Sequence, residues 1–318
     1  MKHSLFGQTL LGMTLLATSA VAAVDPALLA LAPPDTKAFV GIQVDQAQSS
    51  SLGQYMLAHM DSDSGLDKFA TLTGFDPRHD LSQILIATNG KQGPLGSAVI
   101  FGRGAFQPNK LSAAATLSGA TRTTYSGIDL LTSKDAHQTM QTLAFLNPTM
   151  VLIGDTASVR SVIDRYRTGT AFTGALAQRA GEVSGQYQAW FVASSVDELA
   201  NNLGAGGGGG LPVNVMQSIL TAAGGLKLTA DAVTVAVEAM TRTDKDAQSL
   251  VDVVKFLASM VQSNRGNDPN AGRAATLADS ASITANGPVM KISMAIPEKD
   301  IEQLLATPKA GSNRTGRN

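Results

Sequence analysis

Residues 37–44 read KAFVGIQV, a short stretch in which the β-branched or aromatic residues are Phe39, Val40, Ile42 and Val44. This alternating pattern predicts a β-strand. A second stretch of the same kind, WFVAS at residues 190–194, lies in the second half of the chain. The two stretches match as Ala38-Phe39-Val40 with Trp190-Phe191-Val192 and as Val44-Asp45 with Val196-Asp197, at one spacing of 152 residues. These matches suggest an internal duplication.

The segments around the two strands follow a similar order in both halves. In the first half the patterns predict strand 37–44, helices 49–60 and 66–73, strands 84–88 and 97–101, helix 109–117, hairpin 123–132, strands 139–146 and 150–154, and helix 158–167. In the second half they predict strand 190–194, helices 197–202 and 214–222, strands 226–229 and 233–240, helix 246–264, strands 280–285 and 289–296, and helix 298–305.

This order predicts an α+β fold of two tandem similar units, each an antiparallel sheet with helices mainly on one face. We expect the first unit at residues 24–175, the second at 176–306, and a disordered polar tail at 307–318. Asn147-Pro148 and Asn286-Gly287-Pro288 mark corresponding turns. Chance matches within any α+β chain are the alternative explanation, and the hairpin at 123–132 has no counterpart in the second half.

The first 23 residues, MKHSLFGQTLLGMTLLATSAVAA, have the pattern of a secretory signal peptide. A short polar start precedes an apolar stretch, and small residues then offer two cleavage sites, after Ala20-Val21-Ala22 or after Val21-Ala22-Ala23. A membrane anchor is the alternative, but the apolar stretch is short and interrupted for a spanning helix. We therefore expect a soluble protein that is periplasmic or secreted.

Composition excludes several classes of function. The 318 residues include no cysteine, which rules out disulfides, thiol nucleophiles, iron–sulfur clusters and thiolate zinc sites. The net charge of −1 supplies no basic field for nucleic acid. No later apolar run is long enough to predict a membrane span in the mature chain. The sequence indicates no cofactor and no metal.

Residues 61–67 read DSDSGLD and place carboxylates at alternate positions, which is an arrangement that calcium favours. An EF-hand loop beginning at Asp61 would require glycine at its sixth position and glutamate at its twelfth, where Leu66 and Leu72 stand. Helix capping by Ser64 and Asp67 accounts for the same residues. Capping is the preferred interpretation.

A dense polar turn holds Asp76, Arg78, His79 and Asp80. A histidine between carboxylates can act as a base or bind a metal. No second histidine lies nearby in the sequence, so turn formation at Asp76-Pro77, with Asp80 capping or pairing with Arg78, is the preferred interpretation.

Other motifs carry no chemistry. The glycine-rich stretch at 204–210 lacks the Gly-Lys-Ser/Thr of a phosphate loop and predicts a mobile linker, with a ligand-closing lid as the alternative. The chain contains no G-x-S-x-G, S-x-x-K set or H-E-x-x-H motif. The catalytic residues therefore stay unknown.

Pro34-Asp35-Thr36 and the segment Thr73-Gly74-Phe75-Asp76-Pro77, followed by Asp80-Leu81, resemble a group of exported bacterial proteins common in Acidobacteria. The resemblance covers about residues 30–100. That group has no assigned function, so the resemblance implies no activity and transfers no catalytic residue.

Three functional hypotheses follow. The preferred one is a non-enzymatic exported scaffold that binds an unknown protein or small molecule, in a groove between the units. The alternative is an exported hydrolase in which carboxylates from distant segments, such as Asp45 and Asp197, converge at the interface of the units. A third is an assembly factor that uses exposed sheet edges.

Overall fold

The computed structural model describes residues 23–59, 66–90, 98–134, 138–194, 215, 217–229, 231–263, 269–297 and 299–301. Its strands are β1 (Ala38–Gln43), β2 (Leu81–Thr88), β3 (Ala98–Gly104), β4 (Thr121–Tyr125), β5 (Ile128–Lys134), β6 (Met140–Asn147), β7 (Met150–Gly154), β8 (Ala189–Ala193), β9 (Ile219–Leu228), β10 (Ala232–Thr241), β11 (Ser282–Asn286) and β12 (Val289–Pro297). Its helices are α1 (Pro26–Ala30), α2 (Val44–Ser49), α3 (Ser51–His59), α4 (Leu66–Thr73), α5 (Pro77–Asp80), α6 (Pro108–Leu117), α7 (Thr156–Thr168), α8 (Ala175–Ser184), α11 (Asp244–Ser263) and α12 (Pro269–Ser280).

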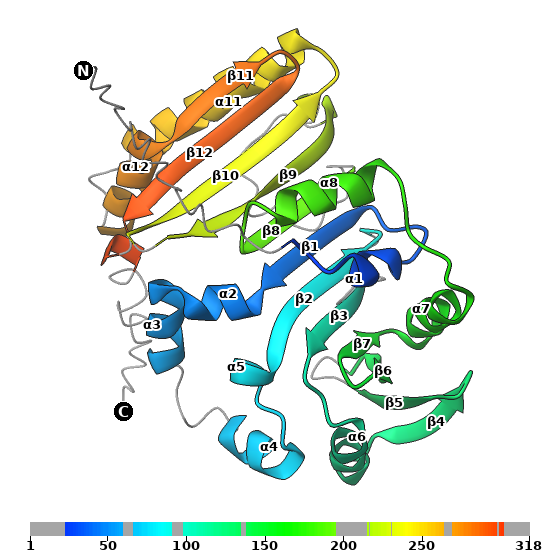
Figure 1. The fold of residues 1–318 in the computed structure, drawn as a ribbon. Helices are drawn as coiled ribbons and strands as arrows, with labels where there is room; N and C mark the ends of the chain where they lie inside the picture. The colour runs from blue at the N-terminus through cyan, green and yellow to red at the C-terminus, as the bar shows by residue number, and fades with distance from the viewer. Residues whose placement is uncertain are drawn as a thin grey trace, which may run out of the picture.

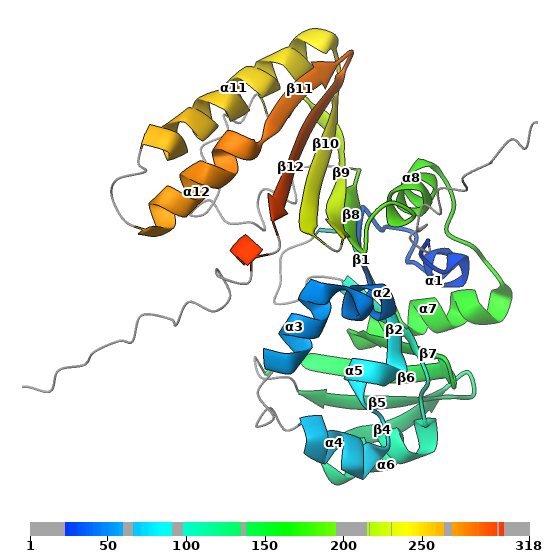
Figure 2. The same cartoon turned by 60° about the vertical axis from the view of Figure 1, so that its left-hand side comes forward.

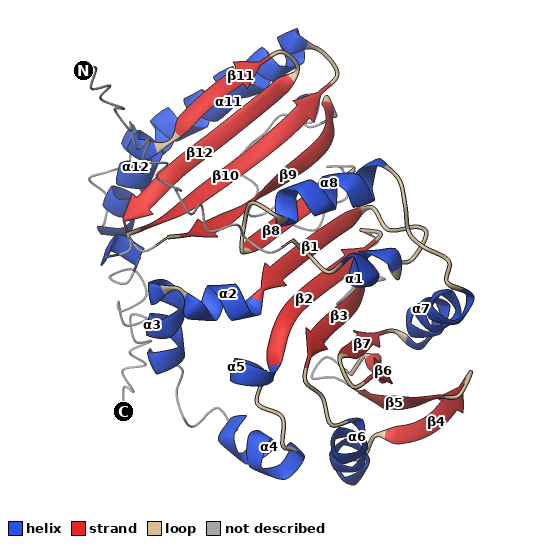
Figure 3. Cartoon of the chain, viewed as in Figure 1, coloured by secondary structure: helices blue, strands red, loops and turns tan. Residues whose placement is uncertain are grey.

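The strands form one 12-stranded sheet in the order β11-β12-β10-β9-β8-β1-β2-β3-β7-β6-β5-β4 (Figures 1 and 3). Every neighbouring pair is antiparallel. The α+β class is therefore confirmed. The prediction of a sheet for each unit is corrected, because β1 and β8 pair from Ala38↔Ala193 to Ile42↔Ala189 and join the two halves into a single sheet.

Alternate residues of each strand define two faces of this sheet. The Phe39 face carries Phe39 and its neighbour Val192, and the Val40 face carries Val40 and its neighbour Phe191. On the Phe39 face, α1, α7 and α8 contribute to the largest apolar core. Buried members of this core include Leu28, Phe39, Leu85, Phe101, Leu130, Leu152, Val162, Ile163, Val183 and Trp190.

The Val40 face is covered at its two ends. Phe75 and Phe106, with Leu111 of α6, pack against Val151 at one end. Leu250 and Val251 of α11 pack against Ala239 and Met290 at the other. Figure 2 shows α11 and α12 on one side of strands β9–β12 and α8 on the other side.

The prediction of helices mainly on one face is therefore wrong. The strands carry apolar residues on both faces, so both faces gain from being covered.

Several predicted elements differ from those observed. The predicted helix at 214–222 is wrong at its C-terminal part, because Ile219–Leu228 forms β9 between β8 and β10. Alanines in that segment favour a helix by propensity, but pairing along both edges decides the conformation. Helix α12 was not expected from the sequence. The segments 61–65, 197–202 and 204–210 lie outside the described residues.

The turn at residues 73–81 has the local structure that its residues predict. Gly74 adopts a φ of 68° after α4, which is the left-handed conformation expected of a glycine that ends a helix. Asp76 then caps α5, and Leu81 begins β2. In the described part of the chain, no helix is both long and apolar enough to cross a membrane.

Candidate functional site

A strongly apolar hollow lies where the two halves of the chain meet. It is a groove of about 450 Å³ on the Val40 face, over strands β1, β8, β9 and β10. The helices that cover the two ends of this face pack mainly against Val151 of β7 at one end and against Ala239 of β10 and Met290 of β12 at the other, beyond the residues that line the groove. The groove therefore occupies the middle of the sheet, with one strand from the first half of the chain and three from the second.

The strand register explains which side chains meet in the groove. Val40 of β1 lies opposite Phe191 of β8, and Phe191 lies opposite Gly224 of β9. Gly224 in turn lies opposite Val237 of β10. A second row runs through Ala189, Leu226 and Val235. Because paired residues share a face, these apolar residues form one continuous floor.

Glycines allow aromatic rings to lie close to this part of the sheet. A Cβ on Gly224 would come within 3.1 Å of Cε1 of Phe191 and within 2.3 Å of the carbonyl oxygen of Ala236. On the Phe39 face, a Cβ on Gly41 would come within 2.2 Å of Cε2 of Trp190. The ring of Trp190 thus lies on the Phe39 face against Gly41, and the ring of Phe191 lies on the Val40 face against Gly224.

The chemistry of the groove is uniform. Its lining consists of alanine, valine, leucine, phenylalanine, tryptophan and glycine residues, without a charged residue or a hydroxyl side chain. Val40 and Leu226 are each 39% exposed, although both are aliphatic residues in the centre of a large sheet. Such a surface can bind an apolar molecule, and it offers no group for acid–base or nucleophilic chemistry.

A second hollow of about 500 Å³ lies on the Phe39 face between α8 and strands β8, β9, β10 and β12. It has a charged edge. Nη2 of Arg179 lies 2.5 Å from Oε2 of Glu238, and Nζ of Lys291 lies 3.1 Å from Oε1 of the same carboxylate. Nη1 of Arg179 also lies 3.1 Å from Oε2 of Glu182.

The electrostatics of this second hollow favour the ionised form of Glu238. Partial burial acts to raise the pKa of Glu238, but the ion pairs with Lys291 and Arg179 outweigh burial and hold the pKa below its usual value. A general acid would need a raised pKa. The lowered pKa does not suit Glu238 to act as a general acid. Its contacts are those of an ion-pair network, in which Arg179 binds both Glu182 and Glu238.

The carboxylates expected for a hydrolase are not brought together in the described residues. Asp45 lies exposed in the first turn of α2, where Oδ1 accepts the N–H of Gln46 at 2.8 Å. Asp197 lies outside the described residues. The geometry gives the hydrolase hypothesis no supporting observation.

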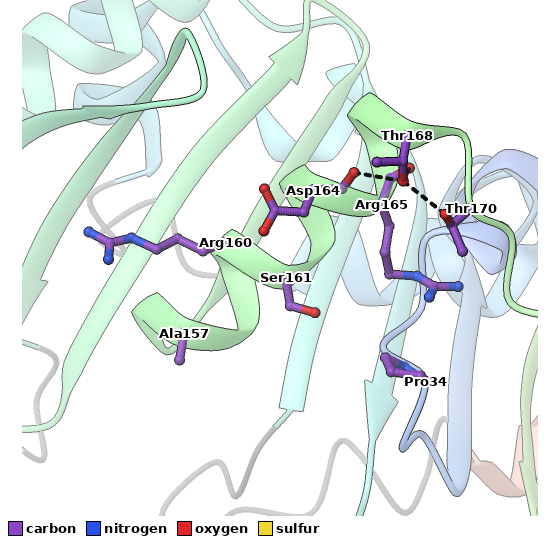
Figure 4. Close-up of a pocket in the computed structure, with 8 residues that line it drawn as sticks. All are labelled: Pro34, Ala157, Arg160, Ser161, Asp164, Arg165, Thr168 and Thr170. Atoms are coloured by element: carbon purple, nitrogen blue, oxygen red, sulfur yellow. Dashed lines mark hydrogen bonds between the residues drawn. The ribbon is translucent and has the colours of Figure 1, made fainter.

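A third hollow, of about 500 Å³, follows the outer side of α7 (Figure 4). Its charged side chains diverge. Arg165 extends towards Pro34, while Arg160 extends away from it. Arg160 lies 5.0 Å from the ring centre of Tyr125, and the hydroxyl of Tyr125 donates to Asp164 at 2.9 Å. The hollow therefore lacks a set of polar groups directed at one point.

The polar turn at 76–80 is held by contacts within itself and with α4. Asp76 accepts the N–H of Arg78 at 2.9 Å, and Oδ2 of Asp80 accepts the N–H of Asp76 at 2.7 Å. Arg78 pairs with Asp76 and Asp67, at 2.8 and 2.5 Å, and not with Asp80. The hydrogen bond from Arg78 lowers the pKa of Asp76. These contacts agree with the turn interpretation, and His79 is exposed beside them.

The calcium hypothesis for 61–67 falls mainly on residues outside the described part, and Asp67 is bound to Arg78. Within the described ranges, no three histidine, aspartate or glutamate side chains are grouped to hold a metal ion. The groove residues were not predicted from the sequence. Two neighbouring pairs in the sequence could have indicated the groove. These are the aromatic pair Trp190-Phe191 and the glycine pair Gly224-Gly225.

Comparisons with known proteins show the fold only. The chain matches no protein-family model and no curated protein sequence. Solved structures of TP0453 are similar in fold at 12% sequence identity. Crystal form I has a TM-score of 0.51 over 89% of this chain and 97% of that chain, and crystal form IV has 0.52 over 90% and 98%.

Proposed function

We propose that this chain is an exported, non-enzymatic binding protein whose groove on the Val40 face takes a small apolar molecule. The observation that carries the proposal is the wholly apolar lining of the groove at the junction of the two halves. Its volume of about 450 Å³ lies within the range of small-molecule sites. Export rests on the signal-peptide pattern of residues 1–23.

The physical driving force is the burial of exposed apolar surface. Each Å² removed from water contributes roughly 25 cal/mol. Val40 of β1 and Leu226 of β9 flank β8, and each has exposed apolar surface that a ligand could bury. The lining offers no side-chain hydrogen-bond partner for a charged or strongly polar ligand, because its one polar side-chain group, the indole of Trp190, is buried. A charged ligand would lose its hydration without compensation, so the ligand class is uncharged and apolar.

We also infer that the groove lies between two duplicated units. The order β1-β2-β3-β7-β6 in the first half corresponds to β8-β9-β10-β12-β11 in the second. In the first half, α6 follows the third strand, β3, and packs on the Val40 face. In the second half, α11 follows the third strand, β10, and packs on the same face. These correspondences support units at 24–175 and 176–306, with β4 and β5 as an extension of the first.

The duplication requires a different sequence alignment from the one with a spacing of 152 residues. A two-fold axis that relates antiparallel β1 and β8 keeps each residue on its own face of the sheet. Phe39 and Phe191, which match at that spacing, lie on opposite faces. An alignment that pairs Val40 with Phe191 satisfies the symmetry, because these residues already face each other across the junction.

Binding of a neutral naphthylamine dye to matched variants tests the proposed function. Val40→Asp places a carboxylate in the groove, whereas Val261→Asp places one on α11, at a valine that is also 39% exposed. Bringing an uncompensated carboxylate against the bound dye costs more than about 1.4 kcal/mol, so Val40→Asp should bind at least roughly tenfold more weakly. Val261→Asp should bind like the unmodified protein.

Two results would count against the proposal. Equal weakening in both variants would place the dye elsewhere on the surface. Binding unchanged by Val40→Asp, in a protein whose unfolding curve shows that it is folded, would remove the groove as the binding site.

A further inference from the structure

The first described residues of the chain are part of the packed structure. Val24 is 3% exposed and belongs to the core of the Phe39 face, whereas Ala23 is exposed. Residues 28, 29, 31 and 32 are also buried in this core. The chain therefore passes from solvent to interior between Ala23 and Val24.

Hydrogen bonds hold the backbone of Val24 and Asp25 in place, where the chain enters the core. The backbone N–H of Val24 donates to Oγ of Ser184 at 3.1 Å, at a buried position. Ser184 is itself fully buried and donates its hydroxyl proton to the carbonyl of Gly181 at 3.0 Å. The next N–H, of Asp25, donates to Oε1 of Gln83 at 3.0 Å. Each of these backbone donors has one matched acceptor.

The charged groups beside this passage are already engaged. Oδ2 of Asp25 lies 2.8 Å from Nη1 of Arg103. Oδ1 of Asp25 accepts the N–H of Ala27 and caps α1. The Asp25 carboxylate thus has its own cation and its own backbone donor.

The two cleavage sites in the signal peptide have different consequences here. Cleavage after Ala22 places the new ammonium group on Ala23, which is exposed. Cleavage after Ala23 places it on the nitrogen of Val24, where one serine oxygen faces a group with three N–H donors. Burying a charge with unmatched donors is costly.

We propose that the chain is processed between Ala22 and Ala23, so that the mature protein begins with Ala23. In this step water adds a hydroxyl to the carbonyl carbon of Ala22 and a proton to the nitrogen of Ala23 as the peptide bond breaks. The Ala23–Val24 amide remains and keeps the buried nitrogen of Val24 neutral. The inference rests on the proposed export of the chain.

Two measurements test the inference. The first is the intact mass of protein recovered from the exported fraction of a bacterial host that expresses residues 1–318. The expected mass is that of residues 23–318. A mass lower by one alanine residue would overturn the proposed cleavage site. An uncleaved chain, or a chain found only in the cytoplasm, would instead overturn the proposed export.

The second measurement tests the physical reason without relying on export. Proteins that start at Ala23 and at Val24 are released from a removable fusion, and a part of the Val24 protein is then acetylated at its α-amino group. All three proteins are unfolded by heat. At pH 7 the Val24 start should unfold about 2 °C below the Ala23 start, because a buried α-amine can lose its proton at a modest cost. The acetylated Val24 start, whose nitrogen is a neutral amide, should recover most of that difference.

Equal unfolding midpoints for the Ala23 and Val24 starts would overturn the argument from burial. A loss that acetylation does not reverse would assign the effect to contacts of Ala23 and overturn the role of the charge.

Discussion

The two faces of the sheet differ most where the halves of the chain meet. On the Phe39 face, Trp190 is 2% exposed and is covered by α8 and the N-terminal segment. Trp190 lies opposite Gly41 of β1. The residue next to Gly41, Val40, lies on the other face, where it is 39% exposed and lines a groove. Both faces are apolar, so hydrophobicity alone does not determine which is covered. At this junction the Phe39 face is buried, whereas the Val40 face leaves the open groove that we propose as the binding surface.

The largest expected effect compares adjacent residues of β1. Phe39→Ala removes a fully buried ring that contacts Phe172 edge-on at 5.5 Å, and it should lower the free energy of unfolding by about 3–5 kcal/mol. Val40→Ala removes a partly exposed side chain and should lower it by less than about 1.5 kcal/mol. Urea unfolding of both variants measures the difference. Similar losses would show that the Val40 face also carries the stability of the fold.

A smaller effect is expected at the segment that covers the Phe39 face. Asp25→Ala removes the cap of α1 and the ion pair with Arg103, and it should lower the free energy of unfolding by about 1–2 kcal/mol. Asp45→Ala removes an exposed carboxylate at the start of α2 and should change it by about 0.5 kcal/mol or less. Equal changes in thermal unfolding would mean that the N-terminal segment adds little to the covered face.

The smallest effect concerns the charged hollow on the Phe39 face. Ion pairs hold the pKa of Glu238 below its usual value of 4.5, so this carboxylate stabilises the folded state above that pH. The contribution is lost as pH falls through the lowered pKa. Between pH 6 and pH 3, the unmodified protein should lose more stability than Glu238→Gln, although partial exposure keeps the difference small. Identical pH dependence in urea unfolding would contradict the ion-pair assignment.

Local patterns predicted most of the elements but not how the sheet is assembled. Strand 37–44, the hairpin at 123–132 and helix 246–264 follow periodicities that can be counted within one segment. The junction of β1 with β8 depends on residues about 150 positions apart, and no local signal specifies it. β9 was missed for the same reason, because its alanines and glycines act as a strand only between two partners.

The groove could be predicted only in part. A binding groove between two units was one expectation from the sequence, and it stays a proposal. The apolar hollow lies over β1 of the first half of the chain and β8, β9 and β10 of the second. Its apolar character could not be derived, because a strand pattern does not show which face will be left uncovered. Asp45 shows the opposite limit, because it was considered as a site residue and does not line the groove. It was selected for its spacing to Asp197, but the fold places it on an exposed helical turn.

Energy transfer from Trp190 tests the apolar groove most directly. Trp190 is the only tryptophan of the chain and lies in β8, which lines the groove. Excitation of Trp190 should produce emission from a bound naphthylamine dye, and Val40→Asp should abolish this emission while Val261→Asp preserves it. A dye that binds without receiving energy from Trp190, or that receives it equally in both variants, would contradict binding in the groove.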